Sequence, residues 1–204
     1  MMAGLRERKK EQTRRRISEV AMRLFDARGY EAVTVNEIAE AAGVAKVTLF
    51  NYFPTKESLA LDGVMDDTAA VVAGRGEGRT PLAALREHYR AMGARGVGDL
   101  DVEAMLTKVR VIAASPALVA GVQRTHAGQR AALAAELEDV HPGLTGRLMA
   151  AQITAAVTTL QEAFFQRLAT GVPLEEAGQC LVEEVELAFD LLEHGFSSIK
   201  GEKS

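Results

Sequence analysis

Residues Val33–Leu59 read VTVNEIAEAAGVAKVTLFNYFPTKESL, and the spacing within this stretch decides the fold. Thr34 can cap the amides of the next turn while Glu37 reaches back to the capping residue, which is the pattern of a capping box. A start signal of this kind predicts a short helix over 34–42. Gly43 follows it, and because glycine takes a left-handed conformation at no steric cost, the chain can turn sharply there.

A second short helix is predicted over 45–52, immediately after the glycine turn. Leu49 and Phe53 would lie on its inner face and pack against the first helix. Helix, glycine turn and helix make up the helix-turn-helix arrangement, whose second helix enters the major groove of DNA. We therefore expect the outer side of the second helix to carry the residues that meet DNA.

The outer side of this motif carries side chains that suit DNA. Lysine can neutralise phosphates, and hydroxyl groups can hydrogen-bond to phosphate oxygens. Asparagine can pair with an adenine edge, and valine can pack on a thymine methyl group. Each residue alone could be a solvated surface residue, but their combination on one short helix favours DNA binding. The candidate DNA-binding residues are Thr34, Asn36, Ala45, Lys46, Val47, Thr48, Asn51, Tyr52 and Lys56.

Charge is distributed unevenly along the 204 residues, whose formal net charge is −4. Residues 1–56, called the head below, hold 11 Lys and Arg against 7 Asp and Glu, a net of +4. Residues 57–204 hold 13 against 21, a net of −8. A basic head on an acidic body indicates that only the head meets a polyanion, the alternative being a solvated basic helix.

Composition excludes several classes of protein. Hydrophobic residues make up 48% and charged residues 25%, as in an ordinary globular protein. One cysteine cannot form an internal disulfide or a multi-cysteine zinc site. The longest uncharged stretch, Leu148–Gln161, is shorter than the ~20 apolar residues of a membrane span. The charged N-terminus has no apolar signal region behind it. We expect a soluble cytoplasmic protein.

Prolines and apolar spacing predict an all-α fold. Thr80 and Ser115 each precede a proline, which is the pattern of an N-cap with proline at the first helical position. Between such marks the apolar residues recur at three and four, as in amphipathic helices. Only Val109–Ile112 hints at a strand, and it is too short to outweigh its helical neighbours. The expected helices are 8–28, 34–42, 45–52, 56–73, 80–95, 100–113, 116–140, 144–170 and 173–195.

The stretch 24–59, LFDARGYEAVTVNEIAEAAGVAKVTLFNYFPTKESL, resembles the TetR family of one-component bacterial transcriptional regulators. The Gly29-Tyr30 turn, the Thr34 cap, Ala42-Gly43-Val44 and Tyr52-Phe53-Pro54-x-Lys56 all fall at the family's spacing. The resemblance implies a helix-turn-helix DNA-binding domain over 1–55 and a ligand-binding and dimerisation domain over 56–204. It also implies a homodimer formed through the last two long helices. The family's operator contacts carry over to Thr34, Lys46, Thr48, Tyr52 and Lys56.

Two positions depart from the family pattern. Phe50 stands where the family often has tyrosine, so one hydrogen bond to a phosphate is missing. Val47 stands where glycine is common, which places an apolar side chain close to DNA. The segment FNYFPTKESL is similar to members proposed to sense acyl-CoA-like molecules.

The resemblance implies a repressor that binds a palindromic operator in duplex DNA and is released by a small-molecule effector. An architectural DNA-binding protein without an effector is the alternative, but it would not need the long run of apolar helix after the head. Arg110 and His126 would anchor an acidic effector, because a buried charge needs a partner. Core packing or a surface position is the alternative for every pocket candidate. These are Tyr89, Met92, Met105, Val109, Arg110, Ile112, Gln123, His126, Thr158, Gln161 and Phe165.

A helical enzyme is the remaining alternative, and the sequence disfavours it. Glu138 and His141 have the Glu-x-x-His spacing of di-iron bundles, but such a site needs two of these motifs. Asp190 and His194 are the only other near pair. Neither a nucleophile elbow nor a phosphate-binding glycine loop occurs in the sequence. We expect no catalytic residue, metal or cofactor.

Overall fold

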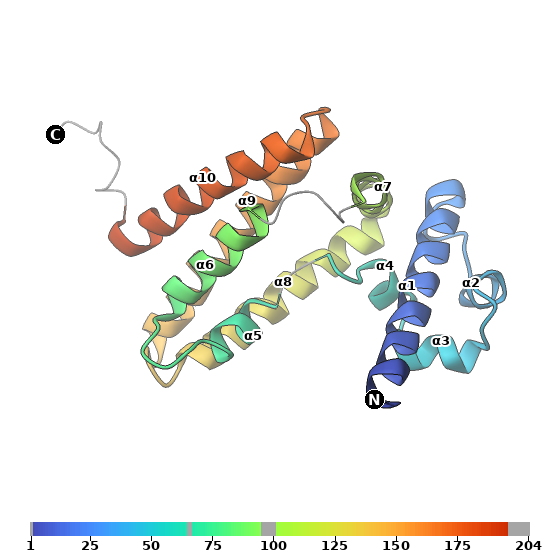
Figure 1. Ribbon diagram of the computed structural model, residues 1–204, viewed down its shortest axis with the longest axis horizontal. Helices are drawn as coiled ribbons and strands as arrows, with labels where there is room; N and C mark the ends of the chain where they lie inside the picture. The colour runs from blue at the N-terminus through green and yellow to red at the C-terminus, as the bar shows by residue number, and fades with distance from the viewer. Residues whose placement is uncertain (1, 65–66, 95–100, 196–204) are drawn as a thin grey trace. The chain divides into compact units, whose positions relative to one another are not determined.

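The computed structural model describes residues 2–64, 67–94 and 101–195, and every regular element within these ranges is an α-helix (Figure 1). The all-α prediction is thereby confirmed, and Val109–Ile112 is helical. Within the same ranges no single helix is long and apolar enough to cross a membrane. Only the helix pair Val102–Ala113 and Pro116–Leu137 passes by length and composition, and that pair is bent by 103°. The helices are α1 Met2–Arg28, α2 Val35–Ala41, α3 Lys46–Tyr52, α4 Lys56–Ala60, α5 Thr68–Ala73, α6 Pro81–Ala94, α7 Val102–Ala113, α8 Pro116–Leu137, α9 Leu144–Ala169 and α10 Leu174–His194.

The chain divides into two compact units. The first comprises 1–65 and 103–124, and the second comprises 66–102 and 125–204. Helix α8 therefore contributes its first residues to one unit and its remainder to the other. These two units are defined by the compactness of the folded chain. The predicted boundary after residue 55 instead separates a DNA-binding domain from a ligand-binding domain, and it stays a prediction.

The core of the first unit is built on the apolar stripe of α1. Helix α1 packs against α2 and α4, and α2 packs against α3. Helices α7 and α8 add Val111 and Leu118 to the same buried cluster, which also holds Ile17, Phe25, Ile38, Leu49 and Phe53. The helix-turn-helix motif is thus held on a continuous apolar core that includes residues far along the chain.

Side chains cap several helices where the sequence predicts caps. The Thr80 hydroxyl accepts a hydrogen bond from the Ala83 amide at 3.2 Å, at the start of α6. The Ser115 hydroxyl accepts one from the Leu118 amide at 3.3 Å, at the start of α8. These hydroxyls satisfy amide groups that have no partner within their helix, which fixes both helix starts.

The helix expected over 56–73 is wrong: it is two helices, α4 and α5. Gly63 has φ +67°, a left-handed conformation that ends the helical path. The Asp62 carbonyl accepts a hydrogen bond from the Lys108 side chain. Asp67 then caps α5 by accepting from an α5 amide at 2.9 Å. The expected helix ends at 95 and 100 lie outside the described residues. Helix α1 begins at Met2, six residues before the expected start at residue 8, and the other ends differ by at most three residues.

The second unit packs α10 against α6 and α9, and α5 against α6. Its buried cluster includes Val72, Leu85, Leu133, Ile153 and Phe189. Helices α6 and α10 approach closely where two glycines meet, because a Cβ atom on Gly178 would lie 2.9 Å from the Gly93 carbonyl oxygen.

Candidate nucleic-acid interface

The start of α2 is fixed by the capping box that the sequence predicts. The Thr34 hydroxyl accepts from the Glu37 amide at 3.3 Å, and the Thr34 amide donates to the Glu37 carboxylate at 2.8 Å. The Thr34 hydroxyl also donates to that carboxylate at 2.7 Å, and Arg28 pairs with it at 2.7 Å. These hydrogen bonds, with the hydroxyl contributing most, lower the pKa of Glu37 to about 2. The carboxylate therefore stays charged at neutral pH and holds the capping residue in place.

The turn between α2 and α3 has the predicted glycine geometry. Gly43 has φ +63°, and its amide donates to the Glu40 carbonyl at 3.0 Å. Leu49 and Phe53 are buried, which confirms the prediction that they form the inner face of the second helix. Since both inner positions are occupied, the remaining α3 side chains lie at or near the surface.

The outer side of α3 is open. Lys46, Val47 and Asn51 are exposed, as is Ala45 just before the helix, while Thr48 and Tyr52 are half-buried. Thr34 and Asn36, at the start of α2, are exposed as well. Most of the candidate DNA-binding side chains are therefore accessible to solvent, and their contacts with DNA stay a prediction.

Lys56 is engaged inside the protein. Its ammonium donates to the Tyr30 carbonyl at 2.9 Å and to the Val33 carbonyl at 3.0 Å, and it lies 4.1 Å from the centroid of the Tyr30 ring. It therefore joins the loop before α2 to the start of α4. A phosphate contact from Lys56 stays a prediction, and it would use the third N–H of the ammonium. Sequence spacing gave no signal for the two carbonyls, because the residues are far apart in the chain.

Arg14 places the basic part of α1 beside the end of α3. Its guanidinium lies 4.7 Å from the centroid of the Phe53 ring, donates to the Tyr52 carbonyl at 3.4 Å and pairs with Asp62. Neighbouring cations of α1 are exposed: Arg8, Lys9, Lys10, Arg15 and Arg16. A row of exposed cations thus runs along the helix that packs beside the motif, which suits contact with phosphates.

Ser115, just before α8, and Arg124 on α8 make polar contacts with the segments that flank α2 and α3. Buried Ser115 donates to Glu31 at 2.6 Å, and that hydrogen bond is the largest cause of the lowered pKa of Glu31. Arg124 pairs with Glu57 at 2.7 Å. Sequence reasoning missed these contacts, because a polar residue in a periodic helix gives no indication of a distant partner.

The predicted pocket residues lie in both units. Met105, Val109, Arg110, Ile112 and Gln123 belong to the first unit, and Tyr89, Met92, His126, Thr158, Gln161 and Phe165 to the second. Their convergence around an effector stays a prediction.

Arg110 and His126 were expected to be buried charges that anchor an acidic effector, and both differ from that expectation. The Arg110 side chain is 52% exposed and pairs with Glu103 at 3.2 Å and with Asp26 at 3.6 Å. It is therefore not the buried charge that the sequence suggested. Burial lowers the pKa of His126 despite the opposing charge of Glu162, which favours its neutral form at pH 7.

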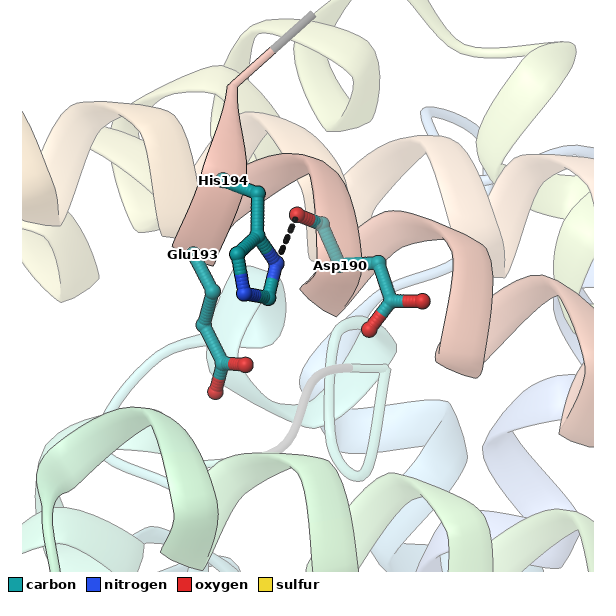
Figure 2. A group of neighbouring side chains, drawn as sticks. All are labelled: Asp190, Glu193 and His194. Carbon is teal, nitrogen blue, oxygen red and sulfur yellow. Dashed lines mark hydrogen bonds between the residues drawn. The ribbon is translucent and has the colours of Figure 1, made fainter. Parts of the chain in front are cut away.

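Among the described residues, one group of side chains that could hold a metal ion lies at the end of α10 (Figure 2). The ligand atoms of Asp190, Glu193 and His194 lie within 4.8 Å of one another, and all three residues are exposed. Arg86 lies 2.5 Å from Asp190 and 3.5 Å from Glu193. A guanidinium that already neutralises both carboxylates disfavours a cation there, so we assign no metal site.

Glu138, which has the Glu-x-x-His spacing with His141, makes a hydrogen bond to the backbone. Its carboxylate accepts from the Gly143 amide at 3.1 Å, just before α9.

Two short helices around a glycine turn, with an open second helix on a basic head, define a helix-turn-helix protein. Residues 17–62 match the family model "Bacterial regulatory proteins, tetR family". The helix-turn-helix segment of this chain is therefore similar to that of the TetR family.

Curated relatives are similar over part of the chain. TcmR, an HTH-type transcriptional regulator of Streptomyces glaucescens, is 36% identical over 125 residues, which cover 57% of this chain and 55% of TcmR. RutR, an HTH-type transcriptional regulator of Escherichia coli K12, is 34% identical over 90 residues, which cover 43% of this chain and 42% of RutR. The chain thus spans about half the length of these relatives.

Solved structures share the fold over nearly the whole chain. NalD, described as the secondary repressor of the MexAB-OprM multidrug efflux pump in Pseudomonas aeruginosa, superposes with a TM-score of 0.54 at 19% identity. That comparison covers 89% of this chain and 97% of NalD. Salmonella enterica GusR gives a TM-score of 0.56 at 18% identity, covering 91% of this chain and 96% of GusR. At such identities the likeness extends to the fold alone.

Proposed function

We propose that the protein is a ligand-responsive transcriptional repressor, which binds a palindromic operator as a dimer and leaves it when a small-molecule effector binds. The observation that carries the proposal is the outer side of α3. It exposes Lys46, Val47 and Asn51 beside a helix rich in exposed cations, while Leu49 and Phe53 anchor it from within. This arrangement suits a helix that lies in the major groove between two phosphate backbones.

The division of labour follows the proposed domains. Residues 1–55 would bind DNA, and residues 56–204 would bind the effector and form the dimer. Two heads related by a two-fold axis would read half-sites about one helical turn apart, roughly 34–36 Å, or slightly more. Thr34, Lys46 and Lys56 would contact the phosphate backbone, and Val47 and Asn51 on α3 would reach the bases.

The dimer is proposed to form through α9 and α10. Leu148 on α9 and Leu187 on α10 are 53% and 58% exposed, and large exposed apolar side chains on long helices are typical of interfaces. Leu187→Glu should therefore raise the dimer dissociation constant. Val119→Glu is the matched control, since Val119 is an exposed apolar residue of α8 in the first unit. Sedimentation equilibrium measures both, and an equal effect of the two variants would contradict this interface.

The effector site is proposed among the pocket residues of the second unit. Tyr89 is buried there, and Thr158, Gln161 and Phe165 are half-buried. Such a mixture, mostly apolar with a few polar groups, is typical of small-molecule sites. His126 would meet the effector as a neutral hydrogen-bonding group, because burial lowers its pKa.

Competition binding tests the proposal against the architectural alternative. Labelled duplex DNA flanking the protein's own gene is titrated with protein in the presence of excess scrambled duplex of the same composition. The proposal predicts a specific complex that survives the competitor and dissociates with compounds that raise the melting temperature of the protein. Equal displacement by scrambled DNA would contradict specific reading. A specific complex that no stabilising compound weakens would favour an effector-independent protein.

A further inference from the structure

Two exposed apolar side chains occupy the side of α3 that is turned away from the core. Val47 is 72% exposed and Phe50 is 38% exposed. Residues three apart lie on the same side of a helix, so the two form one apolar patch. The ammonium of Lys46 lies 5.9 Å from the centroid of the Phe50 ring, which places a cation at the edge of this patch.

Core packing does not account for this patch. Leu49 and Phe53 fill the inner side of α3, at 0% and 1% exposure. Among the described residues of the first unit, Val47 and Phe50 belong neither to the buried cluster nor to the partly buried residues packed against it. Apolar surface left in water on a seven-residue helix gives no folding benefit, so a bound partner has to cover it before it contributes.

The positive charge around the apolar patch indicates which kind of partner covers it. Lys46 and Asn51 flank it on α3. Exposed cations also lie on α1, which packs against α2 and whose Arg14 donates to the Tyr52 carbonyl at the end of α3. Duplex DNA fits a short helix on a cationic surface, because it offers a groove with phosphates on both sides. A membrane or an apolar peptide would not need a helix of this kind. In the major groove the apolar group that a base pair presents is the 5-methyl group of thymine.

We propose that α3 reads 5-methyl groups in the major groove through Val47 and Phe50, so that the operator is recognised in part by its thymine methyls. This inference rests on the proposed DNA-binding function and adds the chemical group that is read. Because 5-methylcytosine carries its methyl group at the same ring position, the same patch would accept it in place of thymine. Binding at those positions would then depend on cytosine methylation.

Uracil-substituted operators test the proposal directly, since deoxyuridine differs from thymidine by the methyl group alone. The operator is first obtained by selection from a random duplex pool, and each thymidine of a half-site is then replaced in turn. Affinities are measured by fluorescence anisotropy at fixed salt. Loss of one buried methyl group should weaken binding about fourfold, and loss in both half-sites about fifteenfold.

The variants show whether Val47 is the reader. Val47→Ala removes the exposed methyl groups of the side chain and keeps a good helix former, and Val47→Thr keeps the shape of valine. The deoxyuridine penalty should fall toward one in Val47→Ala and shrink in Val47→Thr. Lys46→Met, on the same helix, should keep the full penalty. Replacing the sensitive T·A pair by C·G should weaken wild-type binding, and 5-methylcytosine at that position should restore part of the loss.

Each outcome decides between the two claims. A specific operator whose deoxyuridine versions all bind as tightly as the parent overturns methyl reading and leaves the proposed function standing. A deoxyuridine penalty of the same size in Val47→Ala and wild type removes Val47 from the reading surface and overturns the proposal as stated. A selection that enriches no sequence overturns the proposed function and this inference with it.

Discussion

Lys56→Met should destabilise the head, because the ammonium of Lys56 joins two backbone carbonyls of the loop that precedes α2. It donates to Tyr30 and Val33 at 2.9 and 3.0 Å and lies over the Tyr30 ring. A hydrogen bond from a charged donor contributes about 1.5–3 kcal/mol and a cation–π contact about 0.5–1 kcal/mol. Since Lys56 is only half-buried, the sum is discounted to about 2–3 kcal/mol. Methionine keeps a side chain of similar length without the charge.

Lys46→Met is the matched control. It removes the same charge from an exposed lysine whose one aromatic neighbour, Phe50, is 5.9 Å away. Its effect on unfolding should stay within about 0.5 kcal/mol. For a chain of this size, about 2–4 °C accompanies each kcal/mol, so Lys56→Met should lower the melting temperature by about 5–10 °C and Lys46→Met hardly at all. Thermal unfolding followed by circular dichroism measures both.

The salt dependence of DNA binding tests the proposed phosphate contacts of both lysines separately from their effects on stability. Lys46→Met should lower the slope of log affinity against log salt by about 1, as expected for one lost phosphate contact. If Lys56 also contacts a phosphate, its variant lowers that slope similarly, in addition to its effect on stability. A Lys56→Met protein that melts with the wild type would refute the structural role of the ammonium.

Three further changes test other parts of the structure. The pKa of Glu37 is about 2 in the folded protein and 4.5 without the capping box, so its contribution to stability is complete above pH 4.5 and is lost as the pH falls toward 2. The difference in melting temperature between wild type and Glu37→Gln should therefore shrink between pH 4.5 and pH 2. A difference that does not change with pH would refute the assignment. Gly178→Ala should strongly lower the free energy of unfolding in urea, because the new Cβ atom would lie 2.9 Å from the Gly93 carbonyl oxygen. Gly128→Ala, in open space on α8, should instead raise that free energy by about 0.5–1 kcal/mol. Equal effects of the two variants would argue against the close approach of α6 and α10. Val47→Gly should cost about 1 kcal/mol in helix propensity and little else, since its side chain is 72% exposed, and a far larger loss would place Val47 in the core.

Local chemistry made much of the motif predictable. The Thr34 cap, the Gly43 turn and the burial of Leu49 and Phe53 each depend on residues within one or two turns of each other. Spacing along the chain carries that information directly. The accessibility of α3 follows, because once the inner positions are filled the others must face outward.

Contacts between distant residues were not predictable in the same way. Lys56 has the composition of a phosphate-binding residue, yet its partners are carbonyls whose position depends on how α1 and α4 pack. Arg110 lies on a periodic helix and was expected to be buried, but acidic residues from α1 and α7 hold it at the surface. The break between α4 and α5 was missed because the apolar spacing continues through Gly63, whose left-handed conformation periodicity does not register.

Selection of binding sites from a random duplex pool by the purified 204-residue chain tests the central claim most directly. A dimer that presents two α3 helices should enrich one near-palindrome whose half-sites lie about one helical turn apart or slightly more. The same selection with Asn51→Ala should lose its preference at a matched position in each half-site. Enrichment of no sequence, or of a motif without two-fold symmetry that Asn51→Ala enriches equally, would contradict the account.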